Sequence, residues 1–328
     1  MKFIASFLFL LASLLFAGAV WWLQQPLGLK TETVELTVEP GSSARAVVRS
    51  LVQGGVQVDP QLLYWWIRLS GQARLIKAGS YEIGGDPTPR ILVAKLVRGE
   101  VAQRSVTLPE GLTFGQWREL LRKADQLKPD IQELSDTAVM EKLGRPGQHP
   151  EGRFFPNTYA YAKGSSDLAL LRRALQEMDQ RLAAAWAQRA PDSPLKSPDE
   201  ALILASIVEK ETGRPSDRRQ ISGVFNNRLR IGMLLQTDPT VIYGLGARFD
   251  GNLRKRDLQT DSPWNTYTRS GLPPTPIAMP GHDALLAAVQ PAQTRALYFV
   301  ARGDGTSEFS ATLEEHNRAV RKYQLGQR

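Results

Sequence analysis

The chain contains no cysteine and only three histidines among its 328 residues. Without cysteine it can form neither disulfide bonds nor cysteine-ligated metal sites. His149, His282 and His316 lie far apart, and none has a second histidine four residues away, the spacing that puts two metal ligands on one face of a helix. We therefore expect no metal site and no cofactor.

Motifs of several common enzyme classes are also missing. The sequence has no G-x-x-x-x-G-K phosphate loop and no G-x-S-x-G nucleophile elbow. It also lacks internal repeats and low-complexity tracts. Lys and Arg outnumber Asp and Glu by 41 to 33, which suits an anionic partner. The basic residues are scattered rather than clustered, so we expect no nucleic-acid partner.

Charge is absent from residues 3–23. A helix of this length spans roughly 31 Å, about one hydrocarbon core, and Trp21 and Trp22 stand where an aromatic belt belongs. A cleaved signal peptide is the alternative, with a weak cleavage site at residues 17–19, but the apolar run continues past that site. The sequence favours an uncleaved single-pass inner-membrane anchor at 1–23, with Lys2 cytoplasmic and the rest of the chain periplasmic.

Short strands and short helices alternate over residues 32–103, which follow a linker at 24–31. This alternation predicts a small α+β module. A larger domain of mixed helices and strands is expected over 104–328, so the predicted fold class is α+β. The elements expected in the module are strands at 33–38 and 78–83 and helices at 44–51, 59–69 and 87–97.

A strongly apolar helix is predicted to end near residue 211. Ser197 has the character of an N-cap, Pro198 suits the first helical position, and Glu200 lies three residues after the cap. The segment that follows, 201–211, is rich in Ala, Leu, Ile and Val. It is therefore expected to pack in the core of the larger domain.

Two glutamates close this helix, and helical phase separates them. At about 100° per residue, Glu211 projects between Leu204 and Ile207, whereas Glu209 projects to the opposite side. A carboxyl group on an apolar stripe is costly to ionise, so the pKa of Glu211 should be raised. A carboxyl that keeps its proton near neutral pH can act as a general acid. The alternative is a solvated glutamate in the last turn of a helix.

Three stretches rich in amides, hydroxyls and aromatic rings follow, at 225–229, 235–244 and 262–281. Such residues on proline-restrained loops suit a groove for a hydroxyl-rich ligand, because rings cover sugar faces and amides bond to hydroxyls. Turn formation alone is the alternative for each stretch. Asp238, just before Pro239, is either a structural turn residue or a second acid.

Several motifs are specific enough to compare with known families. They are E-G-R-F-F-P-N-T-Y (151–159), A-S-I-V-E-K-E-T (205–212), L-Q-T-D-P-T-V-I-Y-G (235–244), W-N-T-Y (264–267), G-L-P-P (271–274), L-Y-F-V (297–300) and E-H-N (315–317). Together they resemble the endolytic murein transglycosylase family (MltG, YceG-like). Asn157 stands where that family commonly has Asp, a minor departure.

The resemblance implies a LysM-like module at 32–103 and a catalytic domain at 104–328 with its core at 151–323. It implies cleavage of nascent peptidoglycan glycan strands between N-acetylmuramic acid and N-acetylglucosamine, leaving 1,6-anhydro ends. It places the catalytic glutamate at Glu211, the residue that helical phase selects. With the polar stretches, it implies substrate contacts by Gln236, Thr237, Asp238, Asn265, Thr266, Tyr267 and Tyr159.

A single acid fits this chemistry, whereas glycosidases that use water usually need two carboxylates. Two other hypotheses stay open: a hydrolytic muramidase in which Asp238 positions water, and a non-enzymatic cell-wall-binding scaffold. The expected partners are glycan strands and the inner membrane, with peptidoglycan synthases as candidate protein partners. The expected role is to terminate strand elongation.

Overall fold

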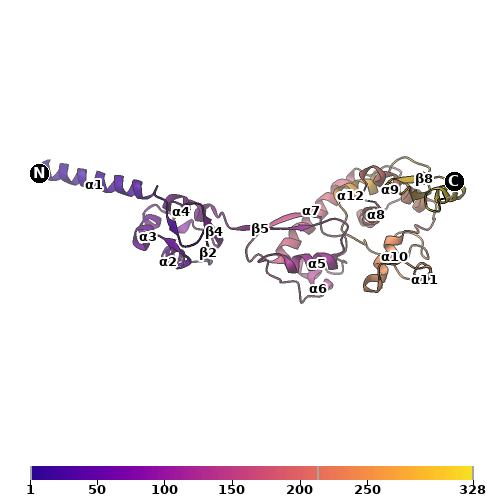
Figure 1. The fold of residues 1–328 in the computed structure, drawn as a ribbon, viewed down its shortest axis with the longest axis horizontal. Coiled ribbons are helices and arrows are strands. Elements are labelled where there is room, and N and C mark those ends of the chain that lie inside the picture. Colours follow the sequence, from indigo (N-terminus) through magenta and orange to yellow (C-terminus); the bar gives the residue numbers. More distant parts are fainter. Residues whose placement is uncertain (1, 213, 327–328) are drawn as a thin grey trace. The chain divides into compact units, whose positions relative to one another are not determined.

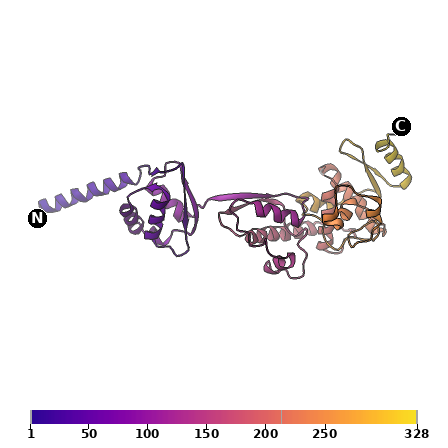
Figure 2. The ribbon, with the colours of Figure 1, turned by 60° about the horizontal axis from the view of Figure 1, so that its bottom comes forward.

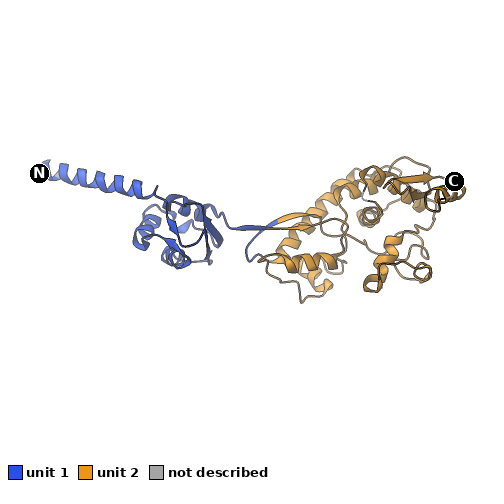
Figure 3. Ribbon diagram, in the orientation of Figure 1, with its two compact units in different colours: residues 1–104, 160–165 blue, residues 105–159, 166–328 orange. Residues whose placement is uncertain are grey.

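The structure, a computed structural model, describes residues 2–212 and 214–326. In that part of the chain helices predominate, and the strands form two-stranded sheets only. This mixture confirms the predicted α+β class. The chain divides into two compact units, coloured separately in Figure 3: unit 1 runs to residue 104 and includes 160–165, and unit 2 contains 105–159 and the chain from 166 onward.

The N-terminal segment is a helix, α1 (Lys2–Trp22), with large apolar side chains exposed along it. Over the residues that the structure describes, no helix has the combined length and hydropathy needed to cross a membrane. The predicted apolar helix is observed from Lys2 to Trp22, and its role as a membrane anchor stays a prediction.

Unit 1 is organised around an antiparallel pair of strands, β2 (Thr33–Val38) and β4 (Gly79–Gly84). Val34, Leu36 and Val38 are buried and the residues between them are exposed, so the alternation read from the sequence is confirmed. Figure 1 shows the helices beside this pair. The remaining elements are β1 (Gly28–Leu29), α2 (Ala44–Gly54), β3 (Val56–Gln57), α3 (Pro60–Leu69), η1 (Gln72–Arg74) and α4 (Pro89–Arg98).

The predicted module elements therefore form within a few residues of their expected bounds. Their caps explain why: the side chains of Ser43, Asp59 and Thr88 accept backbone N–H groups at the first turns of α2, α3 and α4. The LysM-like identity of this module stays a prediction. The chain between α4 and the long helix that begins at Asp167 contains β5 (Gln103–Leu108), α5 (Phe114–Lys123), α6 (Asp136–Lys142) and β6 (Asn157–Ala162).

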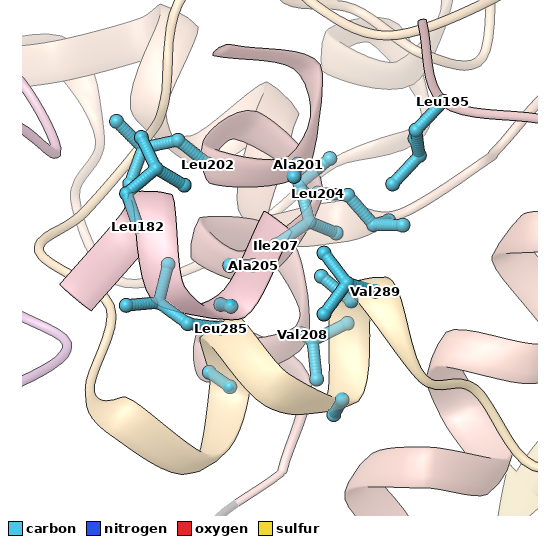
Figure 4. Packing of buried hydrophobic residues seen from close by; sticks show 14 of the residues in the cluster. Leu182, Leu195, Ala201, Leu202, Leu204, Ala205, Ile207, Val208, Leu285 and Val289 are labelled. Carbon is cyan, nitrogen blue, oxygen red and sulfur yellow. The ribbon is translucent and has the colours of Figure 1, made fainter. Parts of the chain in front are cut away.

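A single helix, α8 (Pro198–Glu211), lies at the centre of the core of unit 2. Its residues Ala201, Leu202, Leu204, Ala205, Ile207 and Val208 are all buried, because they pack against apolar side chains of the neighbouring segments. Figure 4 shows them packed against Leu182, Leu285 and Val289. These partners belong to helices that enclose α8 together with α9 (Pro215–Arg230), namely α7 (Asp167–Ala187) and α12 (His282–Val289).

The sequence suggested that the whole stretch 235–244 is a loop, but the structure shows a loop only in its first residues. From Asp238 it forms a helix, α10 (Asp238–Leu245), because Pro239 stands in the first turn, where a missing N–H costs nothing. Residues 235–237, before this helix, are in neither helix nor strand. The segment 262–281 also contains neither helix nor strand, as predicted. After α10 come η2 (Gly246–Arg248) and α11 (Lys255–Gln259).

The chain ends in a hairpin and a helix, drawn in yellow in Figure 2. Strands β7 (Tyr298–Ala301) and β8 (Ser307–Ser310) pair antiparallel, and α13 (Leu313–Tyr323) packs on them. The hairpin reaches the core because Phe299 meets Phe225 of α9 edge to face at 5.9 Å.

Candidate active site

The start and end of α8 determine where Glu211 lies. The helix begins as the sequence predicts: the Ser197 side chain accepts the N–H of Glu200 at 3.2 Å, and Pro198 occupies the first turn. It ends at Glu211, because Thr212 is already extended. The candidate acid is therefore the last residue of the buried helix, at the point where the chain leaves the core.

Glu211 has an environment that favours its protonated form. Withdrawal of its carboxyl group from water raises its pKa from 4.5 to about 7. A hydrogen bond donated by Thr237 to Oε1 lowers the pKa, the charge of Asp238 raises it and Arg228 lowers it. Burial has the largest effect. The raised pKa expected from helical phase is thus confirmed, and the group can donate or accept a proton near neutral pH.

Buried threonines hold the backbone beside Glu211. Thr237 is 2% exposed, and its N–H donates to Oγ1 of Thr266 at 3.1 Å. The hydroxyl of Thr240 lies 2.9 Å from that of Thr266 and donates to the carbonyl of Thr237 at 2.8 Å. These bonds join the N-terminus of α10 to the 262–281 segment. We call Thr237, Thr240 and Thr266 the threonine cluster.

Gln236 adopts an unusual backbone conformation next to this cluster. Its φ is +49°, in the left-handed region that non-glycine residues seldom enter. Its N–H donates to the carbonyl of Thr266 at 3.1 Å, while its side chain is exposed. Strained residues of this kind are concentrated at functional sites. The exposed amide of Gln236 is consistent with the predicted substrate contact.

Asp238 and Tyr267 form a pair near Glu211. The Tyr267 hydroxyl donates to Oδ1 of Asp238, which is exposed. Burial raises the pKa of Tyr267, and its bond to Asp238 raises it further. Both groups act electrostatically with Glu211, so the structure brings the two predicted residues to the candidate acid.

Other predicted contact residues lie inside the fold. Asn265 is 1% exposed, and Thr266 is buried in the threonine cluster. Tyr159 is also buried, and its hydroxyl donates to the carbonyl of Phe155 at 2.7 Å. Burial thus places these three side chains inside the fold, and the substrate contact predicted for them stays a prediction. Turn-forming and core roles, the simpler alternative for such residues, fit this burial as well.

The buried side-chain amide of Asn265 is fully hydrogen-bonded within the protein. Its Nδ2 donates to the carbonyls of Asp257, Leu258 and Thr260 at 3.3, 3.0 and 2.7 Å. Its Oδ1 accepts the N–H of Tyr267 at 2.8 Å. Asn265 thus joins α11 to the segment that carries Tyr267.

Glu209 is the first ionisable group that the sequence reading undervalued. Its side chain is 5% exposed, accepts the N–H of Gly281 at 3.0 Å and lies 3.7 Å from Nη2 of Arg218. Burial raises its pKa, while the Gly281 bond opposes the shift. Arg218 also approaches Glu110 at 3.6 Å and Asp283 at 3.2 Å. The signal was available: Glu209 projects near Leu202 and Ala205, both apolar, so its side of the helix was not expected to be solvated.

Glu151 is the second ionisable group that the sequence reading undervalued. It is 3% exposed and accepts the N–H of Phe114 at 3.0 Å, and burial raises its pKa to about 7 while bonds from Phe114 and Tyr243 lower it. The next residue, Gly152, has φ +76°, and a Cβ there would lie 2.4 Å from Pro276. The E-G-R-F-F-P motif therefore packs tightly against 271–281, and its glutamate is an internal hydrogen-bond acceptor.

No group of three or more His, Cys, Asp or Glu residues able to hold a metal ion occurs among residues 2–212 and 214–326. What the site offers is one carboxyl group of raised pKa, hydroxyl donors and an exposed carboxylate. Fold and site together define an α+β protein that carries a carboxyl group of raised pKa at the end of a buried helix.

The chain belongs to the YceG-like family, whose sequence profile matches residues 36–322. A Bacillus subtilis protein named endolytic murein transglycosylase is 32% identical over 311 residues, covering 89% of this chain and 85% of that protein. A Streptococcus pneumoniae protein of the same name is 27% identical over 369 aligned positions, covering 98% of this chain and 65% of that protein.

A solved structure supports the same grouping. The 2.6 Å crystal structure of a YceG-like protein from Listeria monocytogenes matches with a TM-score of 0.55 and 28% sequence identity. The match covers 88% of this chain and 98% of the other. The family resemblance read from the motifs is therefore confirmed.

Proposed function

We propose that this protein is a peptidoglycan lytic endotransglycosylase in which Glu211 is the only catalytic carboxyl group. The observation that carries the proposal is the position of Glu211, a residue of the E-K-E-T motif: it ends the buried helix α8 next to exposed Asp238, and burial raises its pKa to about 7. The names of the two bacterial relatives support the reaction class. Glycan strands of peptidoglycan are then the substrate.

In the proposed reaction, protonated Glu211 gives its proton to the oxygen that links N-acetylmuramic acid to N-acetylglucosamine. The bond from the muramic C1 to that oxygen breaks, and the N-acetylglucosamine side leaves with a new hydroxyl. The resulting carboxylate of Glu211 accepts the proton of the muramic C6 hydroxyl, and the oxygen of that hydroxyl bonds to C1. The product is a 1,6-anhydro ring; no water is consumed and Glu211 is protonated again.

A pKa near 7 suits both halves of this cycle. A group that must first donate and then accept a proton works best when its pKa is close to the working pH. Exposed Gln236 and the Asp238–Tyr267 pair are the side chains that we assign to glycan contact. Hydrolysis with Asp238 as the water-positioning group is the second candidate, because Asp238 is exposed and interacts with Glu211.

Digestion of purified glycan strands by the wild type and by Glu211→Gln, read by mass spectrometry, tests the proposal. We expect shortened strands ending in anhydro residues from the wild type and none from the variant. Products heavier by one water would favour the hydrolytic muramidase. Strand binding without shortening by either protein would favour the non-enzymatic scaffold.

We also propose that the protein acts on the periplasmic side of the inner membrane, where nascent strands are made, and that it terminates their elongation beside peptidoglycan synthases. The uncharged residues 3–23 support export. A C-terminal fusion to an enzyme active only outside the cytoplasm should be active. Activity of a reporter that works only in the cytoplasm would contradict this localisation.

A further inference from the structure

Thr237 makes the one side-chain hydrogen bond to Glu211 within the described residues. Its hydroxyl donates to Oε1 of the carboxyl group. From the sequence, Thr237 was expected to touch the glycan, but at 2% exposure its side chain faces the protein interior. Its hydroxyl therefore acts on Glu211.

The direction of this bond follows from the other possible partners. Within the described residues, Oγ1 of Thr237 has no second hydrogen-bond partner, so its proton has Oε1 as acceptor. If Glu211 instead carried its proton on Oε1 and donated it to Thr237, the buried hydroxyl proton would have no acceptor, which is unfavourable. Oε1 therefore accepts, and the acidic proton of Glu211 belongs on Oε2.

The backbone of Thr237 is fixed strongly enough to impose this arrangement. Its N–H donates to Thr266 at 3.1 Å, and its carbonyl accepts from the Thr240 hydroxyl at 2.8 Å. The preceding residue, Gln236, turns the chain through the left-handed region. With both backbone polar groups bound and the turn set before it, Thr237 has little freedom to release Oε1.

We propose that Thr237 is a positioning residue, which holds Oε1 of Glu211 so that the transferable proton is carried by Oε2. The assignment rests on the proposed function, because it concerns the oxygen that meets the glycosidic bond. The same bond stabilises the carboxylate after proton donation, so Oε2 is also the atom that accepts the proton of the C6 hydroxyl. One oxygen serves both steps, and Glu211 need not rotate between them.

The electrostatics agree with this geometry. The Thr237 bond lowers the pKa of Glu211, against the larger effect of burial that raises it. Removing the hydroxyl should therefore leave Glu211 protonated to a higher pH than in the wild type. This gives a readout that a purely structural role for Thr237 would not change.

The test compares Thr237→Val and Thr237→Ser in the full chain, with glycan-strand digestion followed as a function of pH. Valine keeps the branched shape without the hydroxyl, and serine keeps the hydroxyl. For valine we expect kcat to fall on the order of 10²-fold, the cost of a slightly misplaced catalytic group, with KM within about twofold. The alkaline limb of kcat/KM should move to higher pH. Serine should restore both kcat and the pH profile to near wild type.

Ser222→Ala is the matched control. Ser222 is also a fully buried hydroxyl in unit 2, bonded to Asn226 Nδ2 at 3.2 Å, but it makes no contact with Glu211. We expect this variant to lower thermal stability without moving the pH profile. Should Thr237→Val fail to fold, Thr237→Ala removes the hydroxyl without adding bulk.

Three results would overturn the assignment: a valine variant with wild-type kcat and pH profile, a valine variant changed only in KM, or a serine variant as impaired as valine. A change only in KM would return Thr237 to substrate binding. Failure of the proposed function is separate, because it would appear as absence of anhydro ends in the wild type itself.

Discussion

Glu209 and Glu211 stand two residues apart at the end of α8 and face two different regions of unit 2. Both are withdrawn from water, and burial raises the pKa of each. Glu209 meets the guanidinium of Arg218 and the N–H of Gly281, at the start of α12. Glu211 meets a threonine hydroxyl and the charge of Asp238, at the start of α10.

The charged groups beside the two carboxyls differ: Glu110 and Asp283 raise the pKa of Glu209 and Arg218 lowers it, whereas Asp238 raises the pKa of Glu211. A neighbouring cation favours the ionised form, whereas a neighbouring carboxylate favours the protonated one. Arg228 also lowers the pKa of Glu211, but its guanidinium is committed to the carbonyls of Leu297 and Leu235, at 2.7 and 2.9 Å. Burial therefore raises the pKa of two carboxyl groups on one helix, and among the described residues Glu209, unlike Glu211, has a cation within salt-bridge distance.

The largest expected effect is on catalysis, and it is measured by comparing substitutions of the two glutamates. Glu211→Gln keeps shape and hydrogen bonding but removes the transferable proton, so we expect strand cleavage to fall about 10²–10⁴-fold with folding intact. Glu209→Gln should cost far less activity, because that carboxyl group does not meet substrate. Rates of anhydro-end release by mass spectrometry measure both. Reversed phenotypes would disprove the distinction.

The next effect is on stability and depends on the cation at Glu209. Arg218→Met leaves a buried carboxyl group without its partner, and breaking such a pair costs about 3–5 kcal/mol. The pKa of Glu209, already raised, should rise further, so the loss of stability should grow as pH increases through that value. Denaturant unfolding at pH 5 and pH 8 should show the larger loss at pH 8.

Arg318→Met is the control for this variant. Arg318 pairs with Glu314 at 2.5 Å, but the two side chains are 56% and 82% exposed. Exposed pairs of this spacing are worth about 0.3–0.5 kcal/mol, so the control should change stability little at either pH. An Arg218→Met variant as stable as the control would show that Glu209 does not depend on its cation.

Local sequence signals were sufficient for α8 and for Glu211. Ser197, Pro198 and Glu200 mark the start of the helix, and the helical phase of Glu211 depends only on its own segment. The different directions of Glu209 and Glu211 were also predictable, because helical geometry fixes the angle between them. Such features need no knowledge of distant segments.

What sequence reasoning missed depends on contacts between distant segments. The partners of Glu209 are Arg218, on the next helix, and Gly281, 72 residues away. Buried Glu151 is hydrogen-bonded by Phe114 of α5 and Tyr243 of α10, both far from it in the sequence. Composition could not distinguish an amide-rich groove from an amide-rich scaffold either. A buried asparagine and an exposed glutamine cannot be told apart from the sequence.

A third test compares the buried and exposed members of the polar stretches. Asn265→Ala removes the amide NH₂ group whose two N–H donors are shared by the carbonyls of Asp257, Leu258 and Thr260, so we expect a loss of about 1–3 kcal/mol. A residue lining a groove would cost almost nothing. Gln236→Ala should leave stability nearly unchanged while weakening glycan cleavage.

Thermal unfolding and cleavage rates of the two variants provide this comparison. A stable Asn265→Ala variant with impaired cleavage would return Asn265 to the groove. A Gln236→Ala variant that cleaves at the wild-type rate would remove Gln236 from it.

The smallest effect concerns Glu151, which shares a pKa of about 7 with Glu211 but lies inside the fold. Its folded-state pKa is raised from 4.5, so the stability it contributes is fully present below about 4.5 and is lost as pH rises through about 7. Glu151→Gln is always neutral and should not show this loss. Its bond from Phe114 is weaker than one to a carboxylate, so the net gain at pH 8 should be about 1 kcal/mol.

Thermal unfolding between pH 4 and pH 8 measures the difference, which should vanish at the acid end. Cleavage activity should stay near wild type, because a raised pKa without access to substrate cannot produce catalysis. A Glu151→Gln variant that folds but fails to cleave strands would make Glu151 a second catalytic carboxyl group. The single-acid mechanism would then give way to a two-carboxylate one, in which water rather than the C6 hydroxyl attacks.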